Sequence, residues 1–252
     1  MNETTEKVLQ DRVILVTGAG QGIGRTAALT FAAAGATVIL LGRSATKLEA
    51  VYDEIIAKGG PEPIFLNIDL AQMTQRSFEE FAHRVKLELG KIDGILHNAA
   101  AFYNLAPLHL QNIEQWEKLM RVNVIAPFAL NQAFLPLLKS SPDAAVILTG
   151  ETHGLEPNAF WGGFAVSNGA LLNYLKIQAA EWEMFPNLRI NLLVPGAVQS
   201  PQRAKTHPGE VHENLPLPEV LMDEYLYWMS AASRGRSGEI IVLNDPEEFI
   251  SE

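Results

Sequence analysis

Four glycines stand at alternate positions between an apolar stretch and a helical pattern. Residues 13–16 are Val-Ile-Leu-Val, Thr17 follows, and the glycines precede an alanine-rich helical pattern that ends at Gly35. A glycine turn lets backbone N–H groups approach a phosphate closely, and a helix N-terminus adds a positive dipole. The stretch predicts a dinucleotide pyrophosphate site, with a purely structural strand-to-helix turn as the alternative. The predicted site residues are Gly18, Gly20, Gln21, Gly22, Ile23 and Gly24.

The residue after the second predicted strand indicates which dinucleotide is bound. A site for NAD usually places an acid there, to bind the ribose 2′-hydroxyl. Here the apolar residues 37–41 are followed by Gly42 and Arg43, with no acid. The planar guanidinium of arginine makes charge-assisted hydrogen bonds to a phosphate. Arg43 therefore favours NADP over NAD, the alternative being a solvated surface charge.

The spacing of the glycines resembles that of a known family. Position 23 is Ile, so G-x-G-x-x-G is absent in this register, and the chain has T-G-x-x-x-G-I-G over residues 17–24. This pattern is similar to that of the short-chain dehydrogenase/reductase family. Two later segments also resemble family motifs: residues 97–100, HNAA, are similar to N-N-A-G, and residues 195–200, PGAVQS, are similar to P-G-x-V-x-T.

The resemblance implies further cofactor contacts, all at the ends of predicted strands. In the family an acid after the third strand contacts adenine, and the hydroxyl of the last motif meets the nicotinamide amide. Asn98 would tie neighbouring strands together and line the cleft, although a side-chain cap of its own loop is the alternative. The implied contacts are Asp69, Leu70, Asn98, Ala99, Ala100, Pro195, Gly196, Val198 and Ser200.

The catalytic positions that the resemblance implies are mostly occupied by other residues. The family uses a Tyr, a Lys four residues later, a Ser thirteen residues before the Tyr, and an Asn on the preceding long helix. The matching positions here are Phe164, Asn168, Glu151 and Asn123, of which only Asn123 is retained. A Tyr hydroxyl has a pKa near ~10 that a neighbouring Lys lowers, and neither Phe nor Asn replaces this pair. We therefore expect ordinary hydride transfer between a carbonyl and an alcohol carbon to be impaired.

Three classes of function remain open from the sequence. The first is an NADP-binding protein whose usual chemistry is disabled, which acts as a sensor, a scaffold or a partner subunit. The second is an oxidoreductase with a substitute acid or base, for which Glu151, His153 and Tyr103 are the candidates. The third is a structural protein that has lost the cofactor, which the kept glycines, Arg43 and Asp69 argue against. We interpret Asn123 as a residue at a helix kink, because Pro127, four residues later, has no N–H to donate to the Asn123 carbonyl.

The elements that position these residues alternate between strand and helix. Predicted strands span residues 13–16, 37–41, 64–68, 92–96, 144–148, 189–194 and 239–243, and predicted helices include 46–58, 77–89, 113–138 with a break at Pro127, 165–182 and 221–229. This alternation predicts an α/β fold with a doubly wound, Rossmann-type parallel sheet. We expect one domain over residues 1–252 and a mobile substrate loop at about 199–220. The resemblance implies a homodimer or homotetramer formed through the two long helices.

Composition excludes several classes of partner. The formal net charge of -10 argues against nucleic acid, and the hydrophobic content of 48% suits a sizeable core. There is no Cys and no apolar run long enough for a membrane span, so we expect a cytoplasmic protein without disulfides. His207 and His212 lie in one loop without a placed third ligand, and we expect no metal site. The substrate is left open.

Overall fold

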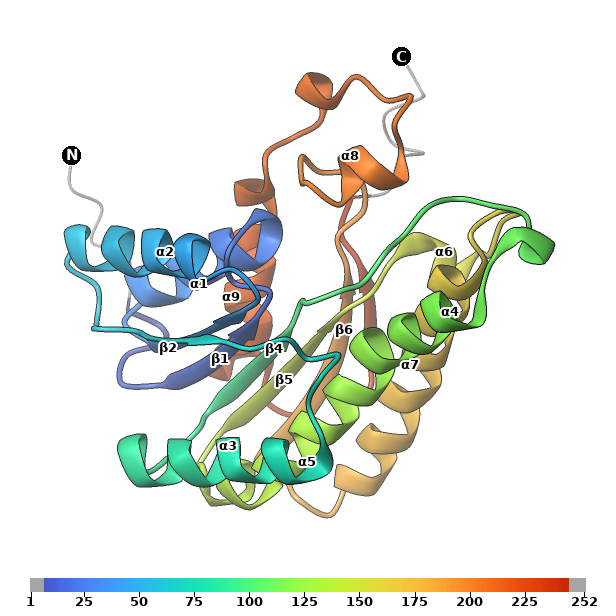
Figure 1. The fold of residues 1–252 in the computed structure, drawn as a ribbon. Coiled ribbons are helices and arrows are strands. Elements are labelled where there is room, and N and C mark those ends of the chain that lie inside the picture. Colours follow the sequence, from blue (N-terminus) through green and yellow to red (C-terminus); the bar gives the residue numbers. More distant parts are fainter. Residues whose placement is uncertain (1–6, 245–252) are drawn as a thin grey trace.

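The computed structural model describes residues 7–244, which form one seven-stranded parallel sheet between two layers of helices (Figure 1). The strand order is β3-β2-β1-β4-β5-β6-β7. This arrangement confirms the predicted α/β, doubly wound fold. The strands are β1 (Val13–Thr17), β2 (Thr37–Gly42), β3 (Ile64–Asn67), β4 (Gly94–His97), β5 (Ala144–Thr149), β6 (Leu188–Val194) and β7 (Ile240–Val242).

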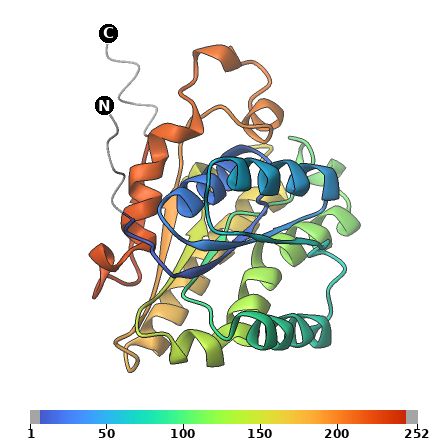
Figure 2. The same cartoon turned by 90° about the vertical axis from the view of Figure 1, so that its left-hand side faces the viewer.

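Each face of the sheet is covered by its own set of helices. Figures 1 and 2 show α1 (Gly22–Ala33), α2 (Ala45–Ala57) and α9 (Met222–Met229) on one face. The other face carries α3 (Gln75–Leu89), α4 (Ile113–Met120), α5 (Ala126–Ser140) and α7 (Gly162–Trp182). Two short helices, α6 (Thr152–Leu155) and α8 (Arg203–Thr206), follow β5 and β6.

The alternation of side chains along β1 shows why both layers are needed. Leu15 joins the core beneath α3, α5 and α7, whereas Ile14 and Val16 join the core beneath α1, α2 and α9. All three side chains have no exposed surface. A strand that is apolar on both faces is stable only when both faces are covered, which is why the strands read as continuous apolar runs.

The long helix predicted over residues 113–138 is divided into three helical segments. Between α4 and α5 lies a π-helical segment, η2 (Arg121–Ile125), in which the N–H of Ala126 bonds to the carbonyl of Arg121. Pro127 has no N–H, so the ordinary helical ladder cannot continue through it, and the wider turn accommodates the loss. The sequence predicts a break at Pro127 itself, whereas the irregular π segment lies just before it, at residues 121–125, and Pro127 stands in the first turn of α5.

Several other element bounds differ by one to three residues from the sequence predictions. Helix α7 begins at Gly162 rather than at residue 165, and the helix predicted over 221–229 begins at Met222 after a 3₁₀ turn, η4 (Pro218–Leu221). The segment predicted as a loop contains α8 and the 3₁₀ turn η3 (His212–Asn214). Within residues 7–244, no helix is both long and apolar enough to cross a membrane.

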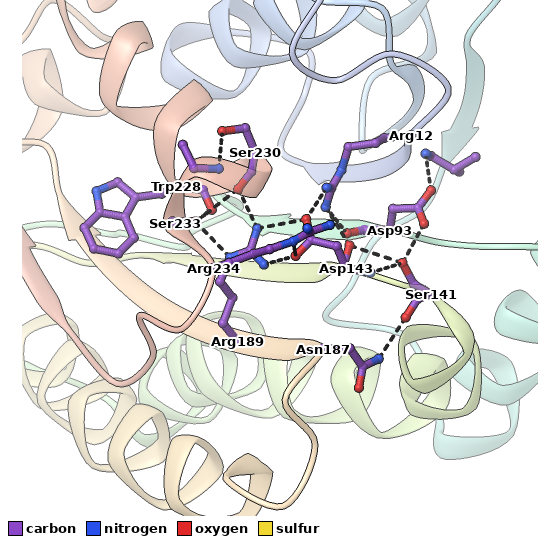
Figure 3. Close-up of polar contacts among 12 residues, drawn as sticks. Arg12, Asp93, Ser141, Asp143, Asn187, Arg189, Trp228, Ser230, Ser233 and Arg234 are labelled. Atoms are coloured by element: carbon purple, nitrogen blue, oxygen red, sulfur yellow. Dashed lines mark hydrogen bonds and ion pairs between the residues drawn. The ribbon is translucent and has the colours of Figure 1, made fainter.

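A buried ion-pair network joins the amino ends of the central strands (Figure 3). Asp143, just before β5, accepts hydrogen bonds from Arg12 at 2.6 Å and from Arg189. Arg189 also donates to the Ser230 carbonyl at 2.6 Å and to Ser233 Oγ at 2.8 Å. The network therefore fixes the starts of β1, β5 and β6 relative to the segment after α9.

The protonation state of Asp143 depends on its arginines. Burial acts to raise the pKa of Asp143, but the hydrogen bonds and charges of Arg189 and Arg12 outweigh it and lower the pKa to about 2. A carboxyl group whose pKa is lower in the folded than in the unfolded state stabilises the fold at pH values above the unfolded pKa. This contribution is lost as the pH falls from the ordinary value of 3.8 towards 2.

We expect Asp143→Asn to lower the free energy of unfolding by about 3–5 kcal/mol at neutral pH, because it leaves buried arginine charges unpaired. Urea unfolding followed by circular dichroism measures the change. Glu239→Gln, which breaks the exposed pair between Glu239 and Arg236, is the control and should cost less than about 1 kcal/mol. Equal effects of the two substitutions would show that the network is not a stabilising centre.

Candidate active site

The glycine turn after β1 has the geometry that a phosphate site requires. Gly18 and Gly22 have φ angles of 70° and 55°, in the left-handed region that favours glycine. A Cβ atom on Gly24 would lie 2.4 Å from the Gly18 carbonyl oxygen and 2.5 Å from Asn98 Nδ2. The turn is therefore closed by backbone contact, and the side chain of its N-cap residue Gln21 makes no capping hydrogen bond to the start of α1.

Thr17 ties this turn to the neighbouring strand. Its Oγ1 accepts hydrogen bonds from the N–H groups of Asn98 and Ala99, both at 3.0 Å, and donates to the Leu96 carbonyl at 3.3 Å. The ends of β1 and β4 are thus held together by one hydroxyl group. Asn98 lies with its amide against Gly18 and Gly24, as expected for a residue that ties strands together.

A cavity of about 330 Å³ lies at the carboxyl ends of the strands. In parallel sheets of this kind, ligands bind at that edge. All of the sequence-predicted site residues line this cavity except Gly24 and Asn123. The lining residues are Gly18, Gly20, Gln21, Gly22, Ile23, Arg43, Asp69, Leu70, Asn98, Ala99, Ala100, Glu151, Phe164, Asn168, Pro195, Gly196, Val198 and Ser200.

Gly24 and Asn123 lie behind the cavity wall. Gly24 is buried against Gly18 and Asn98. The Asn123 amide accepts from the N–H of Ala101 at 2.7 Å, and its Nδ2 lies 3.1 Å from the Ala101 carbonyl and 3.0 Å from Ser167 Oγ. Asn123 therefore connects the π segment to the loop after β4 and to α7 by hydrogen bonds. This suits a residue that positions the kinked helix against these two segments.

Cationic side chains gather where β2 ends. Arg43 directly follows β2, Ser44 caps α2, and Lys47 lies in the first turn of α2, and all three line the cavity. Lys47 donates to the Gln21 side chain of the glycine turn. An anion at this end would meet two cations and a helix N-terminus. Asp69, after β3, accepts from the N–H of Ala71 at 3.1 Å.

The sequence did not single out several residues that line the cavity. Lys47 lies in the first turn of α2, four residues after Arg43, so a second cation near the end of β2 was open to prediction. Lys118, on α4, gave no such signal, because the sequence did not tell which face of that helix meets the cleft. Ser44, Lys47, Lys118, Val122, Pro201, Gln202, Arg203 and Thr206 are lining residues of this kind.

The family's catalytic positions hold no proton donor of the usual kind. The Phe164 ring is buried and packs edge-on against Phe102, with ring centroids 5.1 Å apart. Asn168, one turn later on α7, donates from Nδ2 to the Phe164 carbonyl at 3.0 Å. Both side chains are part of the packed wall of the cavity, and neither titrates near neutral pH.

Two of the three candidate substitute donors lie away from the cavity lining. Tyr103, which we expected in a loop facing the cleft, is a third exposed and is not a lining residue, so that expectation is wrong. The His153 ring stacks on Trp161 with centroids 3.5 Å apart and does not line the cavity either. Glu151 does line it, and its carboxylate caps α6 by accepting from the His153 N–H at 2.7 Å.

The segment after β6 packs over this end of the cavity. His207 lies beside Trp161, with ring centroids 5.3 Å apart, and burial lowers the pKa of His207, as does the charge of Arg203. His212 Nε2 lies 3.2 Å from the N–H of Ser200. Among residues 7–244 no three His, Asp or Glu side chains gather as a metal site would require, so the two histidines have structural contacts instead.

Comparison with known proteins identifies the family. The family model for short chain dehydrogenases matches residues 12–210. The uncharacterized oxidoreductase YciK of Escherichia coli K12 is 38% identical over 233 residues, 92% of each chain. A short chain dehydrogenase structure from Pseudomonas syringae is 40% identical with a TM-score of 0.92 and covers 95% of this chain and 97% of its own. The chain belongs to the short-chain dehydrogenase/reductase family.

A further similar structure contains a nucleotide. It is a short chain dehydrogenase from Shigella flexneri 2a complexed with NADP, 37% identical, with a TM-score of 0.91. The match covers 94% of this chain and 99% of that one.

Proposed function

We propose that the protein binds NADP(H) in the cavity at the carboxyl edge of the sheet and that ordinary hydride transfer to or from a carbonyl or alcohol carbon is impaired. The main observation behind this proposal is that Phe164 and Asn168 occupy the family's Tyr and Lys positions and are packed in the wall of the cavity. The bound nucleotide would supply a hydride at its nicotinamide ring. The residues of the chain would bind and orient it without donating a proton.

The cavity fits a dinucleotide phosphate. Gly18 and Gly22 have left-handed backbone and Gly24 is closely packed, and a glycine turn of this kind before a helix allows a phosphate to approach the backbone closely. Arg43 and Lys47 offer charge to a 2′-phosphate, and the solved relative from Shigella flexneri carries NADP. These features support NADP over NAD.

We expect Arg43→Ala to remove the preference for NADP(H). A bidentate charged contact is worth roughly 1.5–3 kcal/mol, so the unmodified protein should bind NADP(H) at least about tenfold more tightly than NAD(H). Isothermal titration calorimetry measures both affinities. Arg84→Ala, on the exposed surface of α3, is the control and should leave the ratio unchanged. Equal affinity for the two nucleotides in the unmodified protein would refute the assignment.

One specific observation favours a second candidate function. Glu151 lines the cavity, and His153 Nδ1 lies 3.1 Å from its carboxylate. A carboxyl and imidazole pair can exchange a proton with a substrate oxygen. An active oxidoreductase that uses Glu151 in this way is therefore the alternative to a disabled site.

A turnover assay separates the two functions. We expect the unmodified protein to oxidise NADPH at or near background with a panel of aldehydes, ketones and quinones, because general acid–base assistance of about 10²–10⁴-fold is lost. The triple variant Phe164→Tyr, Asn168→Lys, Glu151→Ser should turn over well above Phe164→Tyr alone, since these groups act as a unit. Rapid turnover by the unmodified protein that Glu151→Gln abolishes would establish the alternative.

We also propose a homodimer or homotetramer formed through α4, α5 and α7. These helices expose apolar side chains on the outer surface, among them Ile113, Phe128 and Ile177. Light scattering at micromolar concentration should give at least a dimer, and Ile177→Glu should shift the protein towards monomer. Leu87→Glu, at an equally exposed apolar position on α3, should not. A monomeric unmodified protein would contradict the proposal.

A further inference from the structure

The end of the cavity beyond β5 carries a negative charge. The Glu151 side chain is about five-sixths buried and lines the cavity next to Thr149 and Gly150. Its carboxylate accepts hydrogen bonds from the His153 N–H at 2.7 Å and has His153 Nδ1 at 3.1 Å. These contacts hold the Glu151 carboxylate at the start of α6.

No lysine or arginine within residues 7–244 forms an ion pair with Glu151. Arg43 and Lys47 line the cavity at the end of β2, and Lys118 lines it from α4. Arg203, from α8, is paired with Glu210. Asn168, where the family's lysine would stand, supplies a neutral amide.

A dinucleotide bound along the strand ends would place its nicotinamide at this end. With the adenosine 2′-phosphate at Arg43 and the pyrophosphate at the glycine turn, the remaining lining residues include Glu151, Phe164, Pro195, Gly196 and Val198. The oxidised nicotinamide ring carries a positive charge, and the reduced ring carries none. A carboxylate that no lysine or arginine neutralises in an ion pair therefore interacts differently with the two forms.

We infer that the cavity selects the oxidised nucleotide, NADP⁺, over NADPH, and that Glu151 determines this choice. The inference rests on the proposed function and names the form of the ligand. The replacement of Lys by Asn168 and of Ser by Glu151 makes this end of the site more negative by two charges than the family pattern. A protein that holds NADP⁺ tightly and does not turn it over responds to the ratio of NADP⁺ to NADPH.

The test is the affinity of each form measured by calorimetry at a pH of about 8, where histidine is ordinarily neutral. Two unit charges in a partly screened cleft change an affinity by about tenfold, so NADP⁺ should bind about tenfold more tightly than NADPH. Glu151→Gln keeps the size and an oxygen that can cap α6, and it should bring the two affinities within about twofold. Asn168→Lys adds a cation and should reduce the ratio in the same direction.

Glu156→Gln is the matched control. Glu156 is exposed at the end of α6, outside the cavity lining, and loses the same charge. It should leave the ratio of affinities unchanged. Equal binding of NADP⁺ and NADPH by the unmodified protein, or a preference that Glu151→Gln leaves intact, would overturn this inference and leave NADP(H) binding standing. Binding of neither form would overturn the proposed function as well.

Discussion

The carboxyl edge of this sheet depends on the close approach of the loop after β4 to the glycine turn after β1. Thr17 Oγ1 accepts hydrogen bonds from two N–H groups of that loop. A Cβ atom on Gly24 would lie only 2.5 Å from Asn98 Nδ2. Any side chain at position 24 would separate the two strand ends. The backbone surface on which a pyrophosphate can rest exists because this contact is made with glycine.

The two ends of the sheet have different physical characters. The amino ends are held by the buried Asp143 network, in which Arg12, Arg189 and Arg234 share one carboxylate (Figure 3). The carboxyl ends open into a cavity whose polar groups include Arg43 and Glu151. The buried network thus lies at the opposite end of the strands from the charged and polar groups that line the cavity.

The sequence predicted the fold and most of the cavity for one physical reason. Buried parallel strands are continuous apolar runs, and the residues that follow them must meet at one edge. Arg43, Asp69 and Ser200 could therefore be placed together from strand ends that lie far apart in the chain. The comparisons confirm the family that these motifs indicated.

Other features depend on packing that strand ends do not reveal. The π segment arises because α5 must pass Pro127 while Asn123 holds the loop after β4. Tyr103 is not among the residues that line the cavity, although its loop follows β4, whose end lies at the cavity. The sequence does not indicate that Glu151 caps a helix, apart from the presence of His153 nearby. Helix α6 has four residues, which is too short for a helical periodicity of apolar residues to be recognised.

The most direct test of this account is a competition measurement. The protein is equilibrated with equal concentrations of NAD⁺, NADH, NADP⁺ and NADPH, separated from free nucleotide, and denatured, and the released nucleotides are quantified by chromatography. The account predicts close to one nucleotide per chain, with NADP⁺ in clear excess over the other three. Release of NAD⁺ or NADH as the main species, or of no nucleotide, would contradict it.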